Sequence, residues 1–194
     1  IGFDEQGGEC VFSSEIDTHA RETYQSNFNE LPNGDIRKIT VEDIPEHDLL
    51  VGGFPCQPFS IAGVSKLSSM GRSHGFLEET KGTLFFEICR ILEHHKPKVI
   101  LLENVKGLTW HDEGKTFAKI TSTLESLGYT LSHKVINSKN FVPQRRERIF
   151  IVGFNDGTKF EFPELPDNLP VLKDILEKSV DPKYTINDHL WAYH

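Results

Sequence analysis

Patterns that bind metal ions or form disulfides are missing from this sequence. It contains three cysteines in 194 residues, an odd number with wide spacing and without a Cys-x-x-Cys pair. Such a pattern argues against a disulfide framework and against a zinc site, and it fits a reducing cytoplasmic compartment. The nine histidines are dispersed except for His94 and His95, which point to different sides of a predicted helix. We therefore expect no metal ion.

Long apolar runs and nucleotide-binding glycine motifs are absent as well. No run approaches the ~18 apolar residues of a membrane span, and no signal peptide opens the chain, so no membrane partner is expected. Gly114-Lys115-Thr116 resembles the end of a phosphate-binding loop, but Thr109 occupies the position that requires the first glycine. No Gly-x-Gly-x-x-Gly motif occurs either. Nucleotide triphosphate chemistry therefore lacks support.

Positive charge is in short supply. The formal net charge is −8, whereas binding of nucleic-acid phosphates normally requires a basic face. A local basic cluster exists at Arg145, Arg146 and Arg148, but the global balance argues against strong DNA binding by this chain alone. The 37% hydrophobic and 26% charged residues are ordinary for a globular domain that buries a core.

Predicted strands and helices alternate along the chain, which is typical of an α/β fold with a mostly parallel sheet. Ligands of such sheets bind at the carboxyl ends of the strands. Glu15, Cys56 and Glu103 each lie at or just past a predicted strand end, so all three are expected to face one crevice. Residues 61–81 are predicted to form a long loop. The predicted strands are 10–15, 49–52, 99–102, 129–136 and 148–153, and the predicted helices are 20–28, 83–95 and 115–127.

Three local expectations accompany this pattern. The run 99–102 is continuously apolar, which predicts a strand buried on both sides. Gly128 follows the third predicted helix and is expected to cap it. Cys10 and Cys89 fall in a predicted strand and a predicted helix, so both are interpreted as core residues.

A cysteine between two prolines is the most informative feature of the chain. The segment Phe54-Pro55-Cys56-Gln57-Pro58 follows the apolar run 48–53, so the thiol lies on a stiff turn beyond a predicted strand. Such a position suits a nucleophile. Two later segments combine acidic, amide and basic side chains: Leu101-Leu102-Glu103-Asn104-Val105 and Gln144-Arg145-Arg146-Glu147-Arg148-Ile149-Phe150.

Together and in this order, the three segments closely resemble the DNA (cytosine-5)-methyltransferase family, over about residues 2–154. The resemblance implies a class I S-adenosylmethionine-dependent methyltransferase fold with a Rossmann-like sheet. It also implies methyl transfer from S-adenosylmethionine to cytosine C5 in double-stranded DNA, with S-adenosylhomocysteine as the second product.

Cytosine C5 is a poor nucleophile, so its methylation requires temporary addition of a strong nucleophile at C6. The family resemblance assigns this role to Cys56. It assigns to Glu103 the protonation of N3, by a carboxylic acid that burial keeps neutral. Asn104 is expected to hold the local backbone. Arg146 and Arg148 are spaced to share one face of a strand, and the resemblance implies that they donate to cytosine O2.

The target atom is inaccessible in a stacked duplex, so the cytosine must be flipped out of the helix. The loop at 61–81 resembles the family's closing loop, with additional residues around 67–74. Which of its side chains contact phosphate stays open. Gln144 has either a backbone-organising or a DNA-contacting role. The predicted DNA contacts are Gln57, Ser60, Lys81 and Gln144.

The cofactor contacts are also implied by the resemblance. Glu15 matches the acid that binds the ribose hydroxyls, and Ile16 follows where an apolar residue packs on adenine. Asp35 matches the residue that accepts the adenine amino group, and Ile36 packs on the ring. The remaining predicted cofactor contacts are Gly53, Pro55 and Leu84.

Two family features are not found. A Phe-x-Gly-x-Gly turn after a first strand is absent, since Ile1-Gly2-Phe3-Asp4 matches only the helix that follows it. Residues 1–154 are therefore expected to be a partial catalytic domain, with a sheet incomplete at both ends. Residues 155–194 are expected to be a proline-rich segment leading toward an absent target-recognition domain, whose loss would also explain the acidic balance.

Other functions remain in view. A tRNA cytosine-5 methyltransferase uses much the same motifs, and a catalytically silent regulatory module would be expected to lack Cys56 or Glu103. A thiol hydrolase lacks a Cys–His motif here. The expected location is the cytoplasm, for a bacterial or phage-encoded protein that associates with the nucleoid. The sequence leaves open the target site, the biological role, the oligomeric state and the base that removes the C5 proton.

Overall fold

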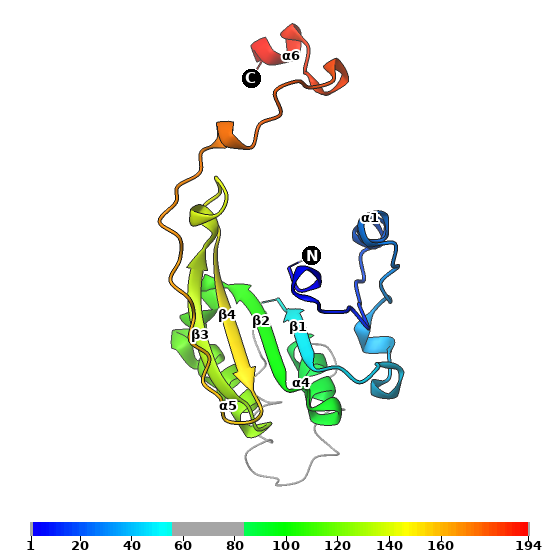
Figure 1. The fold of residues 1–194 in the computed structure, drawn as a ribbon, viewed down its shortest axis with the longest axis vertical. Coiled ribbons are helices and arrows are strands. Elements are labelled where there is room, and N and C mark those ends of the chain that lie inside the picture. The colour runs from blue at the N-terminus through cyan, green and yellow to red at the C-terminus, as the bar shows by residue number, and fades with distance from the viewer. Residues whose placement is uncertain (1, 56–83, 194) are drawn as a thin grey trace. The chain divides into compact units, whose positions relative to one another are not determined.

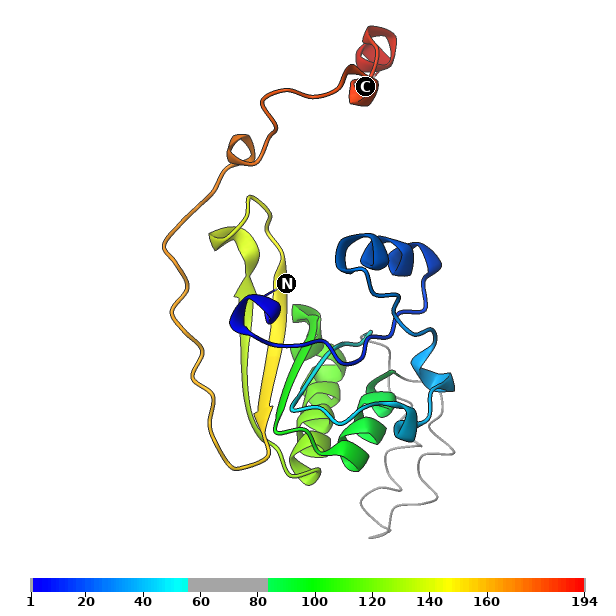
Figure 2. The same cartoon turned by 45° about the vertical axis from the view of Figure 1, so that its right-hand side comes forward.

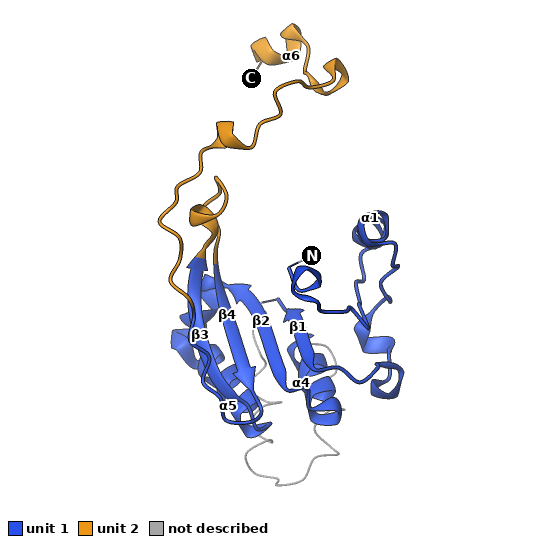
Figure 3. Ribbon diagram, viewed as in Figure 1, with its two compact units in different colours: residues 1–136, 148–162 blue, residues 137–147, 163–194 orange. Residues whose placement is uncertain are grey.

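The structure, a computed structural model, describes residues 2–55 and 84–193 (Figure 1). Cys56, Gln57, Ser60 and Lys81, together with the whole of the predicted loop at 61–81, lie outside the described residues. The chain divides into two compact units (Figure 3). The first comprises Ile1–Ile136 and Arg148–Phe162, and the second comprises Asn137–Glu147 and Pro163–His194.

The described residues form a four-stranded sheet with the order β1-β2-β4-β3. Strand β1 pairs with β2 in parallel, whereas β4 pairs with β2 antiparallel. Neighbouring strands are hydrogen-bonded along their backbones, so this order fixes which strand ends meet. The strands are β1 (Leu49–Gly53), β2 (Val99–Val105), β3 (Thr130–Asn137) and β4 (Glu147–Phe154).

The α/β prediction is confirmed, but the prediction of a mostly parallel sheet holds only for β1 and β2. The reason is the short connection between β3 and β4, residues 138–146. A parallel connection requires a crossover of about a dozen residues or more, usually a helix. Neighbouring strands joined by so short a segment must run in opposite directions, and β4 lies between β3 and β2.

The predicted helices are present with small shifts of their ends. In the described ranges the α-helices are α1 (Thr18–Phe28), α4 (Leu84–His95), α5 (Lys115–Ser126) and α6 (Asp188–Tyr193). The 3-10 helices are η1 (Asp4–Gln6), η2 (Ile36–Lys38), η3 (Val41–Asp43), η4 (Lys106–Thr109), η5 (His111–Gly114), η6 (Ser138–Asn140), η7 (Leu172–Asp174) and η8 (Pro182–Tyr184). None of the helices in these ranges combines the length and the apolar character that a membrane crossing requires.

Helices α4 and α5 cover the same face of the sheet and form the core of the first unit (Figure 2). The apolar stripe of α4 has helical spacing, with Phe85, Ile88 and Leu92 all buried. Side chains of β2 and β4 meet this stripe from the sheet, and Ile100 and Ile151 are fully buried. Each such side chain contributes about 1.5–3 kcal/mol of hydrophobic free energy relative to an exposed one.

The opposite face of the sheet is only partly covered. Strand β2 alternates between buried and half-buried residues, so the prediction that it is buried on both sides is wrong. On this face Leu101 and Val152 line an open apolar hollow of about 370 Å³ together with Phe154 and Phe160. Helices α4 and α5 cover one face of the sheet. Among the described residues, no helical layer covers the face that carries the hollow.

The segment 10–15 differs from its prediction. It is not a strand, because only Ser14 forms a bridge, to Asn33. The partner segment turns into η2 directly afterwards, so it offers no further backbone groups for a ladder. Cys10 is exposed, which makes its assignment to the core wrong, whereas the assignment of Cys89 is confirmed.

The end of α5 follows its prediction. Gly128 has a left-handed φ of 97°, and its amide donates to the Glu125 carbonyl at 2.9 Å. The amide of Tyr129 donates to the Leu124 carbonyl at 3.3 Å. These paired bonds form the Schellman arrangement, in which glycine relieves the steric cost of a positive φ.

Gly153 provides a test of core packing. It lies opposite Ile100 in the β2–β4 pairing, and an added Cβ would come within 2.8 Å of side-chain atoms of Ile100 and Leu131. We expect Gly153→Ala to lower the free energy of unfolding by about 1–3 kcal/mol, because the crowded core must shift. Urea denaturation measures the change. The matched control is Gly34→Ala, where nothing lies within 4 Å of the added methyl. Equal stability of the two variants would contradict this packing.

Candidate active site

The parallel pairing of β1 and β2 brings the predicted catalytic segments together. Gly53, the last residue of β1, is the register partner of Glu103 in β2. A Cβ added to Gly53 would lie 3.5 Å from the Glu103 carboxylate, so the two are close neighbours. The chain leaves β1 through Phe54 and Pro55 toward Cys56, which lies outside the described residues. The two strand ends meet as the sequence predicted.

Asn104 holds the backbone that follows β1. Its side chain is 2% exposed, and its Nδ2 donates to the Phe54 carbonyl at 2.7 Å. Its Oδ1 accepts the Val105 amide at 2.8 Å. A buried amide that both donates and accepts fixes the backbone on either side of it. The prediction that Asn104 holds the local backbone is therefore confirmed, and the backbone it holds includes the residue before Pro55.

Glu103 and Arg148, both predicted to be catalytic, form an ion pair. Arg148 Nε donates to Glu103 Oε1 at 2.8 Å, and the arginine lies opposite Val105 in the β2–β4 pairing. The Glu103 side chain is 37% exposed and that of Arg148 is 22% exposed. The described residues thus do not supply the burial that was expected around this carboxyl. At this exposure the pair orients the carboxylate more than it stabilises the fold.

Two predicted cofactor segments lie side by side although they are distant in the sequence. The Glu15 amide donates to the Asn33 carbonyl at 2.9 Å, and the Asn33 amide donates to the Ser13 carbonyl at 2.8 Å. Ser14 Oγ adds a bond to the Gly34 carbonyl at 2.6 Å. This pairing places Glu15 and the following Ile16 next to the turn that contains Asp35 and Ile36. Ile16 is 63% exposed, which leaves an apolar side chain open to a ligand.

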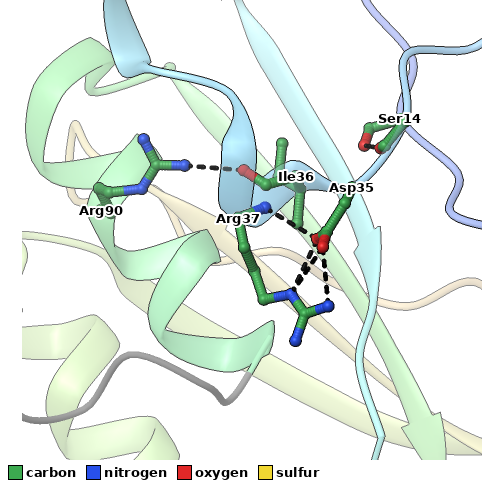
Figure 4. A network of polar contacts seen from close by, with 6 residues as sticks. Ser14, Asp35, Ile36, Arg37 and Arg90 are labelled. Atoms are coloured by element: carbon green, nitrogen blue, oxygen red, sulfur yellow. Dashed lines mark hydrogen bonds and ion pairs between the residues drawn. The ribbon is translucent and has the colours of Figure 1, made fainter.

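Asp35 is held by its neighbour Arg37 (Figure 4). Its Oδ1 accepts the Arg37 amide at 3.1 Å and Nε at 2.8 Å, and Oδ2 accepts Nη2 at 2.7 Å. The side-chain hydrogen bond from Arg37 is the main cause that lowers the pKa of Asp35. The carboxylate is therefore ionised and oriented, but Arg37 occupies much of its accepting capacity.

The other predicted cofactor residues are distributed over β1 and α4. Gly53 and Pro55 are exposed at the end of β1, and Leu84 is the first residue of α4 and is 36% exposed.

In the second unit, the Gln144 carbonyl accepts Ser138 Oγ at 2.7 Å and the Arg146 carbonyl accepts the Ser138 amide at 3.1 Å. These bonds close the connection between β3 and β4, which agrees with a backbone-organising role of the Gln144 segment.

The two described thiols are not candidates for the nucleophile. Burial raises the pKa of Cys89 to about 12, so this thiol stays protonated and unreactive at neutral pH. Cys10 is exposed, and its hydrogen-bond partners among the described residues are the Phe12 carbonyl and the Tyr24 hydroxyl, neither of which belongs to a predicted catalytic residue. Across the described ranges no group of three or more metal-binding side chains occurs.

Sequence reasoning missed three charged residues around the Asp35 turn: Arg37, Glu87 and Arg90. Arg90 Nη2 donates to the Ile36 carbonyl at 3.2 Å (Figure 4). Its Nε donates to Glu87 at 2.9 Å. The spacing of Glu87 and Arg90 is typical of an ion pair on one helix face. The helix was predicted, but the sequence does not show which distant backbone Arg90 would meet.

Comparison with known proteins places these observations in a family. The sequence matches the family described as C-5 cytosine-specific DNA methylase over residues 1–194. It is 50% identical to the Type II methyltransferase M.DsaV of Dactylococcopsis salina, covering 100% of this chain and 54% of that protein. It is also 50% identical to the Type II methyltransferase M.NgoBI of Neisseria gonorrhoeae, covering 98% of this chain and 58% of that protein.

A solved structure shares the fold at low sequence identity. The Dnmt2 methyltransferase of S. pombe superposes with a TM-score of 0.69 at 21% identity, covering 99% of this chain and 59% of that one. The chain thus spans little more than half the length of the relatives that it matches. The predicted methyltransferase fold is confirmed by this likeness.

The hydrogen bond from the Asn104 side chain to the Phe54 carbonyl can be tested by substitution. In Asn104→Asp a carboxylate oxygen replaces the donor, so two acceptors face each other in a buried position. We expect the free energy of unfolding to fall by about 1–3 kcal/mol, measured by urea denaturation at pH 7. Asn155→Asp is the matched control, because its Nδ2 also donates to carbonyls, those of Lys96 and Pro97, at an exposed position. A loss at Asn104 no larger than at Asn155 would count against this role.

Proposed function

The chain belongs to the C-5 cytosine-specific DNA methylase family, and on this basis we propose that it transfers a methyl group from S-adenosylmethionine to cytosine C5 in DNA. One observation carries the proposal. The β1–β2 register sets Glu103, with Arg148 bound to it, beside the strand end from which the Pro-Cys segment departs. A nucleophile and an acid supplied by adjacent strands are the two groups that this reaction needs.

The proposed reaction consists of addition at C6, methylation at C5 and elimination. The Cys56 sulfur forms a bond to C6 of a flipped cytosine, and electron density moves toward N3, where Glu103 delivers a proton. The C5 atom then forms a bond to the methyl group while the bond between this group and the S-adenosylmethionine sulfur breaks and leaves its electrons on that sulfur. A base removes the C5 proton, the Cys56–C6 bond breaks with return of its electrons to sulfur, and N3 gives up its proton. Arg148 fixes the orientation of the Glu103 carboxyl in this scheme.

The residues around the paired segments suit the methyl donor. S-adenosylmethionine supplies an electrophilic methyl group and becomes S-adenosylhomocysteine when the group has left. Glu15 would accept the ribose hydroxyls, and the exposed Ile16 would pack on adenine. One Asp35 carboxylate oxygen would exchange its hydrogen bond from Arg37 for one from the adenine amino group. Ile36 would pack on the adenine ring. The remaining cofactor contacts in this proposal are Gly53, Pro55 and Leu84.

Double-stranded DNA is the proposed partner. The cytosine leaves the helix to reach the thiol, and Arg146 joins Arg148 in donating to cytosine O2. Relatives of this chain carry the name Type II methyltransferase, which supports a role in restriction-modification. A location at the bacterial nucleoid is part of the proposal. The other proposed DNA contacts are Gln57, Ser60, Lys81 and Gln144.

A covalent trap tests the reaction and its nucleophile together. Duplexes that contain 5-fluorocytosine trap the enzyme as the methylated covalent adduct. Fluorine replaces the C5 hydrogen, so no proton is present for the base to remove and the elimination cannot occur. With S-adenosylmethionine present, we expect mass spectrometry to find the adduct on Cys56. Cys56→Ala should give no adduct and no methyl transfer, and it should retain cofactor binding.

Cys10→Ala is the matched control, because it removes an exposed thiol and should react like the unaltered chain. Methyl transfer by Cys56→Ala would overturn the assigned nucleophile. Trapping on tRNA in place of duplex DNA would replace the proposed substrate with RNA.

The acid has its own test. Glu103→Gln keeps the shape of the side chain but cannot deliver a proton, so the rate of methyl transfer should fall at least ~10²-fold. Single-turnover transfer of a radiolabelled methyl group measures the rate. Glu125→Gln on the exposed side of α5 controls for the loss of one negative charge. A near-normal rate for Glu103→Gln would remove this residue from the mechanism.

A further inference from the structure

One arginine joins the core helix to the turn that contains Asp35 and Ile36. Arg90 lies on α4, and its Nη2 donates to the Ile36 carbonyl at 3.2 Å (Figure 4). The residues are far apart in the sequence, so this bond is a tertiary contact. The Arg90 side chain is 21% exposed, which makes the bond less accessible to water than a surface contact.

The arginine is itself held in place. Glu87, one helical turn earlier, accepts Arg90 Nε and Nη2, both at 2.9 Å. The Glu87 side chain is 13% exposed. The planar guanidinium can bind the carboxylate with one edge and the carbonyl with the remaining donors. Glu87 therefore selects the Arg90 conformation that reaches the turn.

The helix that carries this pair is packed against the core. Its opposite face is buried in the core through Phe85, Ile88, Cys89 and Leu92. The turn, in contrast, has no buried residue within η2. A hydrogen bond to a packed element restricts the conformations that an exposed turn can adopt. Arg90 supplies a hydrogen bond from α4 to this turn, and the Glu87 carboxylate of the same helix attracts Arg37 of η2.

We propose that Arg90, oriented by Glu87, is a positioning residue for cofactor binding. It fixes the Ile36 backbone to α4 and thereby presents Asp35 and Ile36 to the adenine ring of S-adenosylmethionine. The inference rests on the proposed function, which assigns the adenine contacts to this turn. Because Leu84 opens the same helix, α4 aligns two proposed cofactor contacts at once.

A second bond from the same helix offers a matched control. His95 Nε2 bonds the Val41 carbonyl of η3 at 2.8 Å, in the same manner in which Arg90 bonds η2. Its side chain is also half-buried. Urea denaturation of both variants measures the loss of general stability, because Arg90→Ala also removes the pair with Glu87 and His95→Ala also removes the ring contact with His47. Only the loss at Arg90 should change cofactor affinity, because η3 contains no proposed cofactor contact.

The experiment compares Arg90→Ala, Arg90→Lys, Glu87→Gln and His95→Ala with the unaltered full chain. Calorimetry measures the Kd for S-adenosylhomocysteine, and hydrogen exchange measures opening of the amides of Lys38 and Ile39, which close η2. Arg90→Ala should weaken binding about tenfold, the effect of one charge-assisted bond, and should speed exchange in η2. Arg90→Lys should recover part of the affinity, and Glu87→Gln should weaken it about threefold. His95→Ala should bind like the unaltered chain.

Kinetics separate positioning from general damage. In Arg90→Ala the KM for S-adenosylmethionine should rise with little change in kcat or in the KM for DNA, since the Cys56 and Glu103 segments keep their own supports. If Arg90→Ala does not fold, Arg90→Lys carries the test, because it keeps a positive charge beside Glu87, whereas Glu87→Gln also removes the attraction between Glu87 and Arg37. Unchanged η2 exchange in the folded variants would overturn the anchoring. Faster exchange with unchanged affinity would overturn the positioning role.

The failure of the proposed function has a different signature. An unaltered chain that binds neither S-adenosylmethionine nor S-adenosylhomocysteine overturns the proposed cofactor, and with it the inference. An unaltered chain that binds, combined with an Arg90→Ala variant that binds equally well, overturns the inference alone.

Discussion

The parallel pairing of β1 with β2 is the constraint on which the arrangement of this site depends. It sets Gly53 beside Glu103, and the Asn104 side chain then fastens the carbonyl of Phe54 across the same two strands. Neither contact is strong by itself, since a typical hydrogen bond adds only about 1 kcal/mol to stability. Their value lies in geometry. A segment that leaves a fixed strand end in a fixed direction brings its side chains to a defined place.

Helix α4 links this pairing to the proposed cofactor turn. One face of the helix fills the core beneath β1 and β2, and its polar edge holds η2 through Arg90. The same packing that stabilises the fold therefore determines where Asp35 and Ile36 lie. Buried side chains pack too closely to permit small displacements at low cost. A precise site can thus be built from exposed turns, provided that each is bonded to a packed element.

Local patterns were good predictors where one face of an element is buried. The helical spacing around Ile88 and Leu92 and the apolar run of β1 gave elements close to those observed. The segment 10–15 misled because an apolar stretch does not reveal whether a neighbour is available to complete a ladder. The direction of β4 was also missed, although the short connection after β3 already excluded a parallel arrangement.

The sequence by itself determined the family and, through it, the chemistry that we propose. Cysteine, glutamate and arginine in three ordered segments indicated the family, and the alternation of elements indicated an α/β fold, because both depend on residue type and local spacing. Only the tertiary structure decided that Arg148 pairs with Glu103, that Asn104 holds Phe54 and that Arg90 meets the Ile36 carbonyl. Those contacts join residues far apart in the chain, and their partners are chosen by strand register and helix packing, which no local pattern encodes.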